Sequence, residues 1–414
     1  MKIQYLLYSI FIKLLPLAVA LLALKDRKAK RWIAGRKNWK ARVSEISTQL
    51  SGQPLWIHAA SMGEYQMAIP LITKFLKTYP ERSVVISFFS PSGYENTKVP
   101  DNCYKFYLPA DTCKNNEYLL EKINPAALVF VKYDLWFRLI QQVNDKNIPL
   151  ILLGFNISIN KWNSWFYGGL VQVSLNQFDL VTVLDENKLD RFAEVCSPDK
   201  IMAGGDLRYR NVLEQVINTK AQPILDKFRK KYAQLIVCGS VWPADLEILA
   251  PIINERKDIG WIVAPHEIDE KKVNQLTKVL KRPFDLYSDL VSSGGDDLKE
   301  IIILNTIGDL FHSYRQADLA YVGGAFGSGL HNILEPAAFG KPVLFGPKID
   351  KFPEASFFIS KQIGASISNN DDLEKMINQF FKQDYFIPKK EILKIMSDSA
   401  DQTDFIYDRI FGLL

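Results

Sequence analysis

A short block near residue 60 carries side chains suited to acid–base chemistry. His58 ends an apolar run, Ser61 follows two alanines, and Gly63 precedes Glu64 where an amphipathic stretch begins. Ser61 is a natural N-cap and Gly63 allows another backbone to approach closely. Glu64 falls in the first helical turn, where the helix dipole stabilises a carboxylate that could accept a proton from an attacking hydroxyl. The same spacing is also typical of a capping arrangement that only starts a helix.

A second block, residues 321–336, leads from an apolar strand into a helix through a glycine-rich loop. The loop includes Gly324 and Gly327, and it is followed by Asn332 and Glu335. Loops of this kind present backbone N–H groups to phosphate. The spacing is not that of the dinucleotide fingerprint, and the Gly-Lys-Ser/Thr of a Walker loop is missing. The block therefore predicts either an anion-binding turn or a plain connection capped by Asn332.

Two further candidates lie at the expected carboxyl ends of strands. His266 follows Val-Ala-Pro, where it could donate to a phosphate or a base or could simply lie at the surface; Ser240 follows Gly239, where it could cradle a phosphate. No pair of the four histidines has metal-ligand spacing, so we expect neither a catalytic metal nor a cofactor.

Length and composition set the frame for these residues. A chain of 414 residues exceeds one ordinary hydrophobic core, and 48% hydrophobic and 23% charged residues are typical of a globular protein. Four cysteines without a CxxC pair indicate reduced thiols, although Cys103 and Cys113 could form a bridge. Positive charge is concentrated in residues 25–43, with nine Lys/Arg and one Asp, so a uniformly basic nucleic-acid binder is excluded.

The alternation of short β-rich runs with helical stretches predicts an α/β fold with two doubly wound parallel sheets. The first series runs through residues 54–205, and the pattern restarts at residues 234–238 and continues to 342–345. A boundary near residues 204–210 gives domains at 25–205 and 206–414. Ligands of such folds bind at the carboxyl ends of the strands, here in a cleft between the two domains.

The first 24 residues form an apolar run that we interpret as an N-terminal membrane anchor. Lys13 makes a central spanning position costly, whereas an interfacial helix tolerates it by snorkelling. The basic residues that follow, with Trp32 and Trp39, suit an anionic inner leaflet and place the body on the cytoplasmic side. A cleaved signal peptide is disfavoured by that cluster. The alternative is an ordinary buried first helix followed by a solvated loop.

Together these blocks resemble the transferases of 3-deoxy-D-manno-oct-2-ulosonic acid (Kdo). That family shows W-I-H-A-x-S-x-G-E, T-S-P-x-G, Y-L-P-x-D, G-N-L-K-like, Pro-Arg-His-Pro and G-G-H-N-x-L-E-P-A blocks in this order. The matching residues are Trp56 to Glu64, Ser90 to Gly93, Tyr107 to Asp111, Gly205 to Arg208, Pro265-His266, and His331 to Ala337, followed by Gly346-Pro347.

The chain also departs from the family pattern. No Arg stands between Pro265 and His266, and Leu330 replaces a glycine before His331. Residues 132–137 correspond to the family's Glu-Thr-Glu-x-Trp-Pro block, but Lys132 stands where the family has a Glu, which reverses the charge. Residues 154–158 correspond to the Asn-Ala-Arg-x-Ser block but lack its Arg. These differences indicate a divergent branch.

The resemblance implies a GT-B glycosyltransferase that moves Kdo from CMP-Kdo to the lipid A precursor, with inversion and without a metal, at the cytoplasmic face of the inner membrane. It implies that Glu64 is the general base, with Ser61, Gly63, Ser90 and Gly93 on the acceptor side. On the donor side it implies that Glu335 holds the ribose. The residues implied around the CMP phosphate and base are Ser240, His266, Gly324, Gly327 and Asn332.

Two other functions remain open at this point. The missing Arg beside His266 keeps a GT-B transferase or epimerase with another nucleotide sugar, such as a UDP-sugar, in consideration. A non-catalytic scaffold docked on the membrane is the third possibility, and Glu64, His266 and Glu335 argue against it.

Overall fold

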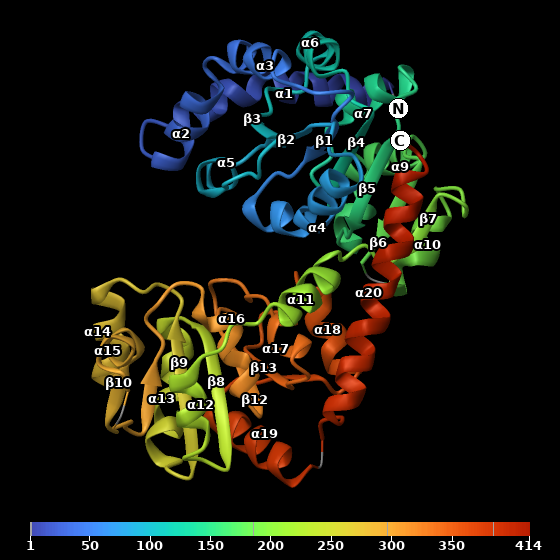
Figure 1. The fold of residues 1–414 in the computed structure, drawn as a ribbon. Coiled ribbons are helices and arrows are strands. Elements are labelled where there is room, and N and C mark those ends of the chain that lie inside the picture. Colours follow the sequence, from blue (N-terminus) through green and yellow to red (C-terminus); the bar gives the residue numbers. More distant parts are fainter. Residues whose placement is uncertain (1, 185, 296, 384) are drawn as a thin grey trace. The chain divides into compact units, whose positions relative to one another are not determined.

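The computed structural model describes residues 2–184, 186–295, 297–383 and 385–414, and the chain divides into two compact units. The first unit comprises Met1–Arg208 and Asp401–Leu414, and the second comprises Tyr209–Ala400. Each unit contains a seven-stranded parallel sheet with helices packed against it (Figure 1). The α/β fold with two doubly wound sheets, predicted from the alternation of strands and helices, is confirmed.

In the first sheet the strand order is β3-β2-β1-β4-β5-β6-β7. The chain moves outward from β1 to β3 and then returns to the other side of β1, so the order reverses between β1 and β4. Its strands are β1 Leu55–His58, β2 Val84–Phe88, β3 Cys103–Tyr107, β4 Ala127–Val131, β5 Leu150–Phe155, β6 Leu180–Val183 and β7 Ile201–Ala203.

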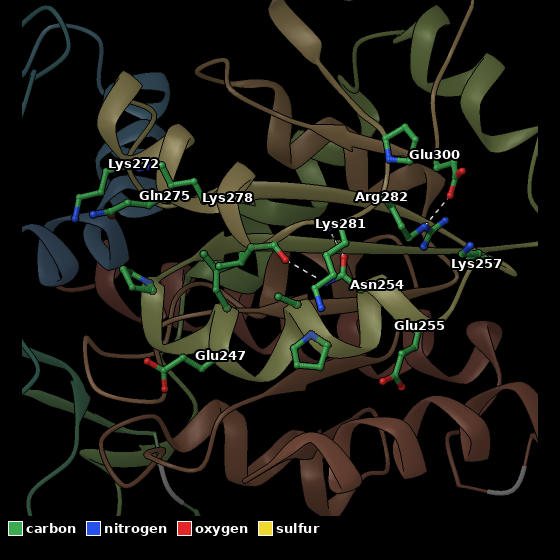
Figure 2. Close-up of a pocket in the computed structure, with 16 residues that line it drawn as sticks. Glu247, Asn254, Glu255, Lys257, Lys272, Gln275, Lys278, Lys281, Arg282 and Glu300 are labelled. Atoms are coloured by element: carbon green, nitrogen blue, oxygen red, sulfur yellow. Dashed lines mark hydrogen bonds and ion pairs between the residues drawn. The ribbon is translucent and has the colours of Figure 1, made fainter.

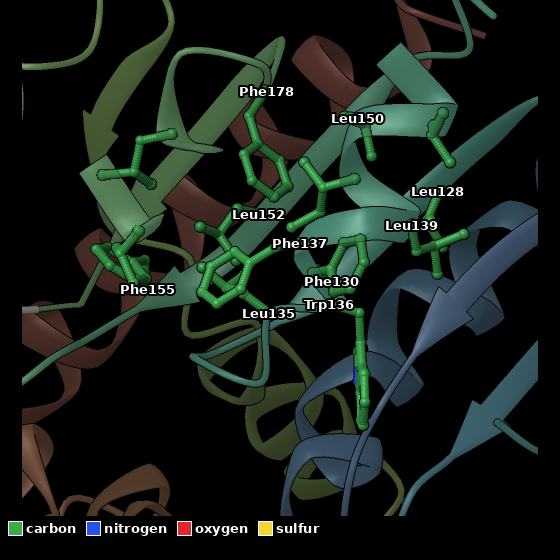
Figure 3. Close-up of a cluster of buried hydrophobic side chains, with 14 of the residues drawn as sticks. Leu128, Phe130, Leu135, Trp136, Phe137, Leu139, Leu150, Leu152, Phe155 and Phe178 are labelled. Atoms are coloured by element: carbon green, nitrogen blue, oxygen red, sulfur yellow. The ribbon is translucent and has the colours of Figure 1, made fainter. Parts of the chain in front are cut away.

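The central strands of this sheet are buried on both faces, which explains their uninterrupted apolar sequences. Trp56, Leu128 and Phe130 point to one face, where they belong to the same hydrophobic core. Figure 3 shows part of this core, around β4, β5 and the helix that follows β4. Leu55 and Ile57 point to the opposite face, against the helix that follows β1. This alternation is the period-two pattern of a strand with apolar neighbours on both sides.

The helices of the first unit cover these two faces. They are α1 Lys2–Leu22, α2 Arg27–Arg36, α3 Trp39–Ser47, α4 Met62–Thr78, α5 Pro91–Asn96, α6 Cys113–Ile123, α7 Phe137–Asp145, α8 Ile159–Trp162, α9 Tyr167–Leu175, the 3₁₀ turn η1 Glu186–Lys188 and α10 Leu189–Ala193.

The second sheet has the order β10-β11-β9-β8-β12-β13-β14. It differs from the first in that β11 lies between β9 and the edge strand β10, and its reversal of strand order lies between β8 and β12. Its strands are β8 Gln234–Val241, β9 Ile259–Pro265, β10 Phe284–Leu286, β11 Ile301–Ile303, β12 Leu319–Val322, β13 Val343–Phe345 and β14 Gly364–Ser366. The remaining helices are α11 Arg208–Ile217, α12 Pro223–Arg229, α13 Pro243–Glu255, α14 Glu270–Val279, α15 Tyr287–Ser293, α16 Asp309–Ser313, the 3₁₀ turn η2 Tyr314–Gln316, α17 Leu334–Ala338, α18 Pro353–Ser360, α19 Asn370–Lys382 and α20 Lys389–Phe411.

The last helix, α20, contributes to both hydrophobic cores. Ile392 and Met396 are fully buried in the core of the second unit, whereas Ile406 and Ile410 are fully buried in the core of the first. Residues 206–414 are all predicted from the sequence to form the second domain, but Asp401–Leu414 belong to the first unit. A single apolar stripe along the helix serves two cores, and its sequence does not distinguish between them.

Part of the N-terminal basic cluster has a structural role rather than the surface role expected for it. The Arg36 guanidinium is buried, donates to the carbonyl oxygens of Leu108 (2.7 Å) and Phe89 (2.7 Å), and lies 3.8 Å from the ring centre of Trp32. Burial lowers the Arg36 pKa to about 9. Trp32 is buried as well, so these two residues tie α2 to the first sheet. All four cysteines are free thiols, as expected.

Shortening a buried side chain near the C-terminal end of α20 is expected to destabilise the first unit selectively. Ile410→Ala removes a fully buried side chain and should cost about 2–5 kcal/mol. The control Phe405→Ala, on the same helix but 55% exposed, should change stability by less than about 0.5 kcal/mol. Hydrogen exchange should then accelerate in β1–β3 and not in β8–β12. Equal acceleration in both sheets would contradict the assignment of this segment to the first unit.

Candidate active site

The reversal of strand order in the first sheet places two loops next to each other. β1 runs through Ala59–Ser61 into α4, and β4 runs into residues 132–136. Because adjacent parallel strands β1 and β4 end at the same edge, their loops flank the crevice where ligands of such sheets bind. Glu64 lies in the first turn of α4, directly after the first loop, and Asp134 lies in the second loop.

Glu64 closes a capping box at the start of α4. Its carboxylate accepts hydrogen bonds from the Ser61 backbone N–H (2.7 Å) and from the Ser61 hydroxyl (3.0 Å), and its side chain is 6% exposed. Burial raises the pKa of Glu64, as does the nearby charge of Asp134, whereas His58 and the Ser61 hydrogen bonds act to lower it. The helix dipole is expected to stabilise the ionised form of Glu64, but desolvation destabilises that form more strongly. The raised pKa makes Glu64 a stronger base than an ordinary glutamate.

The other predicted acceptor-side residues surround this capping box. Gly63 is exposed, and a Cβ added there would have no atom within 4 Å, so the space above the first turn of α4 is open within this unit. Ser90 donates its N–H to Ala60 O (2.8 Å) and caps α5 by accepting from the Gly93 N–H (3.3 Å). A Cβ on Gly93 would lie 2.7 Å from the Phe88 ring, so glycine allows α5 to lie beside Ser61.

A hydrogen-bonded group around His58 was not predicted from the sequence. His58 is fully buried, with its Nε2 2.9 Å from the Trp136 indole nitrogen and its Nδ1 2.9 Å from Ser87 Oγ. The Asp134 carboxylate lies 3.2 Å from the same Nε2. His58 thus joins β1 to the loop after β4 and sets the position of Asp134 near Glu64. The Asp-x-Trp spacing directly after a buried strand is the signal that could have identified it.

In the second unit the reversal of strand order places the ends of β8 and β12 together. Ser240 adopts a left-handed backbone conformation (φ +52°), next to an irregularity in the pairing of β8 with β9. A Cβ on Gly323 would lie 2.4 Å from the Ser240 carbonyl oxygen, so only glycine permits this approach. A strained residue between two parallel strands is typical of a functional turn.

Asp245, which the sequence analysis did not single out, organises the glycine-rich loop. Its fully buried carboxylate accepts from the Trp242 N–H (2.8 Å), the Gly324 N–H (3.0 Å) and the Tyr321 hydroxyl (2.7 Å). The Gly327 N–H donates to the Gly324 carbonyl oxygen (3.1 Å). The N–H groups of Gly324 and Gly327, expected to face a phosphate, are therefore used inside the loop. Gly324 (φ +100°) provides the turn, since a Cβ there would lie 2.1 Å from Gly329 O.

Three aromatic rings, from the loops after β8, β9 and β12, pack against one another. The Trp242 and His266 ring centres are 4.2 Å apart with planes at 19°, and His266 lies 4.4 Å from His331. The Trp242 indole N–H donates to His331 Nε2 (3.0 Å), which places the His331 proton on Nδ1. Burial lowers the pKa of His266, and burial together with His266 lowers the pKa of His331 to about 4. Both rings are neutral near pH 7 and offer dipoles rather than charge.

Glu335 lies in the first turn of α17, beside Asn332. The Asn332 amide group donates to Glu335 Oε1 (3.1 Å) and accepts from the Leu334 N–H (3.2 Å), so it orients the carboxyl and holds the turn that precedes α17. Glu335 is half-buried at the surface of a crowded loop, and desolvation raises its pKa to about 7 despite the Asn332 hydrogen bond. A carboxyl with this pKa can accept hydrogen bonds from a diol when ionised and can donate one when protonated.

A broad hollow elsewhere in the second unit holds none of the predicted site residues (Figure 2). It has a volume of about 1090 Å³ and runs between α13 and α14 toward Asn254, Lys281 and Glu300. These three residues precede or lie at the amino ends of strands, the edge opposite to the carboxyl ends where ligands of such sheets bind. The Arg282 guanidinium there donates to Glu300 (2.8 Å) and to Ile253 O (2.7 Å) as a structural tie.

Two doubly wound sheets in tandem, each with polar side chains at its point of strand reversal, are the arrangement of the GT-B fold. Residues 37–211 match the family model described as 3-deoxy-D-manno-octulosonic-acid transferase (Kdo transferase). A 3-deoxy-D-manno-octulosonic acid transferase of Chlamydophila psittaci is 30% identical over 311 residues, covering 72% of this chain and 70% of that protein. The chain belongs to the Kdo transferase family.

Other relatives agree on the family and the fold. A 3-deoxy-D-manno-octulosonic acid transferase of Chlamydia muridarum is 27% identical over 394 residues, covering 88% of each chain. Among solved structures, the Anabaena HepE protein in complex with UDP superposes with a TM-score of 0.55 at 12% identity, covering 86% of this chain and all of that one (100%). This likeness shows the fold alone.

Replacement of Glu335 by Gln is expected to change how stability depends on pH. Because the folded-state pKa of about 7 exceeds the ordinary value of 4.5, the folded protein binds more protons than the unfolded chain between these pH values. The wild-type unfolding free energy therefore loses up to about 3 kcal/mol from this group as the pH rises from about 4.5 to above 7. Glu335→Gln has no ionisable group at this position and does not lose this stability. The thermal midpoint of the variant should therefore rise relative to that of the wild type between pH 5 and pH 8. A difference that stays constant with pH would contradict the raised pKa.

Proposed function

We propose that this chain transfers Kdo from CMP-Kdo to the lipid A precursor, with inversion at the anomeric carbon and without a bound metal. The observation that carries the proposal is Glu64, a buried carboxylate of raised pKa at the point where the strand order of the first sheet reverses. In a member of the Kdo transferase family, a base at this place would act on the sugar hydroxyl of the acceptor.

The reaction on this proposal is a single displacement. The acceptor hydroxyl oxygen attacks the anomeric carbon of Kdo, and the bond from that carbon to the CMP phosphate oxygen breaks with its electron pair remaining on the phosphate. Glu64 takes the hydroxyl proton. Attack opposite to the leaving group inverts the configuration, and CMP leaves as a stable phosphate anion that needs no general acid. Positioning and electrostatic stabilisation provide the rest of the rate enhancement.

The donor is assigned to the second unit, the predicted donor domain at 206–414. Ionised Glu335 would accept hydrogen bonds from the two ribose hydroxyls. Neutral His266, with Ser240 and Asn332, would lie around the phosphate and the base, where an N–H dipole favours an anion. Gly324 and Gly327 shape this site through the backbone conformation of their loop, since their own N–H groups are engaged.

The acceptor is assigned to the first unit, the predicted acceptor domain at 25–205. Open space above Gly63 and the adjoining Ser90–Gly93 turn support a role for Ser61, Gly63, Ser90 and Gly93 in holding the acceptor sugar near Glu64. Helix α1 is long and apolar enough to meet a membrane, over Ile3–Leu22. We assign the protein to the cytoplasmic face of the inner membrane, anchored there by residues 1–24, because the lipid acceptor resides in that leaflet.

A second candidate donor is a UDP-sugar. The Anabaena protein that shares this fold was determined with UDP, and this chain lacks an Arg between Pro265 and His266. A transferase or epimerase acting on a UDP-sugar would keep the role of Glu335 toward ribose and change the base that the second unit selects. No nucleic-acid partner is proposed on either function.

Glu64→Gln should abolish Kdo transfer while CMP-Kdo binding stays within about threefold of wild type. Loss of one catalytic base typically lowers turnover by about 10²–10⁴-fold. Because Glu64 also caps α4, Thr112→Ala is the matched control: it removes the cap hydroxyl of α6, outside the predicted site, and should leave transfer unchanged. Steady-state transfer to a lipid A precursor is the measurement, with a wild-type turnover that falls with decreasing pH through the raised Glu64 pKa. Retained turnover in Glu64→Gln would refute the assignment of the base.

Nucleotide selectivity tests the donor directly. CMP at about 100 times its Kd should stabilise the protein by about 2.7 kcal/mol, a thermal shift of a few degrees, whereas UDP and GDP should have no effect. Glu335→Ala should abolish the shift with CMP, and Glu64→Gln should keep it. A shift with UDP and none with CMP would replace the donor with a UDP-sugar and leave the fold and the Glu335 role in place.

A further inference from the structure

Helix α1 is docked on the first unit by one face of its N-terminal part. Gln4, Tyr8 and Ile12 are buried, and Leu15 packs against the same core, so the stripe recurs every three to four residues from Gln4 to Leu15. Ala23, which follows the helix, is buried as well. The opposite face of the helix is apolar and bare. Its side chains are 41% to 71% exposed: Ile3, Leu6, Leu7, Ile10, Phe11, Leu14, Leu17, Leu21 and Leu22.

A buried carboxylate fixes the docked face. The Tyr8 hydroxyl donates to Asp111 Oδ2 (2.6 Å), and the same carboxylate accepts from Asn116 Nδ2 (2.6 Å) and from the N–H groups of Arg138 (2.8 Å) and Leu139 (2.9 Å). Asp111 is 3% exposed. The first turns of α6 and α7 are therefore tied to α1 through one group.

Two further polar contacts extend this attachment toward the N-terminus. The Arg138 guanidinium donates to Ser9 Oγ (2.8 Å), and the Gln4 amide donates to the Trp165 carbonyl oxygen (2.6 Å). A Cβ on Gly169 of α9 would lie 2.4 Å from the Gln4 amide nitrogen, so a glycine permits this close packing. The helix is attached by hydrogen bonds as well as by apolar contact.

These contacts are incompatible with a helix that crosses the bilayer. A helix of 21 residues is about 31 Å long, close to the hydrocarbon thickness of about 30 Å. If the docked helix spanned, Asp111, Arg138 and Asn116 would be carried into hydrocarbon, where ionisable groups are costly. If it spanned alone, Tyr8 and Ile12 would leave the core and Asp111 would lose its hydroxyl partner.

We propose that α1 is an in-plane anchor: it lies on the bilayer surface with its bare apolar face in the leaflet and its other face fixed to the first unit, so both ends of the chain stay on one side of the membrane. A bilayer with anionic headgroups fits this surface because Lys25, Arg27 and Lys28 follow α1 directly and are exposed. The Trp165 side chain, 67% exposed beside the start of α1, adds an aromatic group of the type found at membrane interfaces.

Lys13 agrees with this orientation. It is exposed on α1 between Ile12, on the docked face, and Leu14, on the bare face. In a spanning helix its ammonium would lie near the middle of the bilayer, whereas along the surface its flexible stem reaches the headgroups.

The deciding experiment compares the two ends of the full-length protein in inner membranes. Epitope tags on Met1 and on Leu414 are exposed to protease in spheroplasts and in inverted vesicles. Both tags should be cleaved in the same preparation. Cleavage of the two tags in opposite preparations would show a spanning helix and overturn the proposal. The proposal refines the anchor of the proposed function, and this readout is independent of which nucleotide sugar is the donor.

Vesicle flotation of the purified protein tests the bilayer face itself. Phe11→Glu combined with Leu14→Glu should reduce binding to phosphatidylethanolamine–phosphatidylglycerol vesicles by at least tenfold, since both residues lie on the bare face. The matched control is Val291→Glu, an exposed apolar residue of the second unit, which should bind as wild type. Arg27→Ala with Lys28→Ala should weaken binding about fivefold per charge, and only on anionic vesicles. Unchanged flotation of the Phe11/Leu14 variant would refute the assigned face.

Discussion

Much of this structure depends on buried carboxylates that accept backbone N–H groups where helices begin. Glu64 and Asp245 occupy the same position in their units, the third residue of the helix that follows the first strand of each sheet. Asp245 accepts from two backbone N–H groups and a tyrosine hydroxyl, so its oxygens hold the neighbouring loop in place. Glu64 accepts only from Ser61 in the described contacts and faces open space near Gly63. The same capping position thus yields a structural support in one unit and a basic carboxylate in the other.

The proposed donor site in the second unit combines polar groups with little net charge. His266 and His331 have lowered pKa values, and Glu335 has a pKa raised to about 7, all chiefly through burial. The Trp242 indole fixes the tautomer of His331 and stacks on His266. A site of neutral rings and oriented dipoles can hold a nucleoside monophosphate such as CMP and release it after transfer, because it forms no strong ion pair with this product.

Two buried side chains of the first unit hold its N-terminal helix and the loop beside Glu64 in place. Asp111 connects α1 to the starts of α6 and α7, while His58 connects β1 to the loop that carries Asp134. Both ties use side chains that are buried among the helices and strands of one sheet. On the proposed function, an anchor fixed in this way would keep the unit at a constant height and orientation above the leaflet, which would suit an acceptor whose lipid part remains in the bilayer.

The sequence by itself determined the α/β fold, the positions of most central strands, the helix start at Ser61–Glu64 and the turn that precedes Glu335, because these rest on local spacing and apolar runs. It also carried the resemblance to the Kdo transferases. Only the tertiary structure decided the raised pKa of Glu64, since its burial and the nearby charge of Asp134 both depend on residues distant in the chain. The engagement of the Gly324 N–H by Asp245, the burial of Arg36 and the sharing of α20 between two cores likewise depend on contacts across long sequence separations. The sequence pattern of an apolar stripe or a charged residue does not depend on which residues it contacts in the folded protein. Those contacts are determined only when the strands and helices pack together.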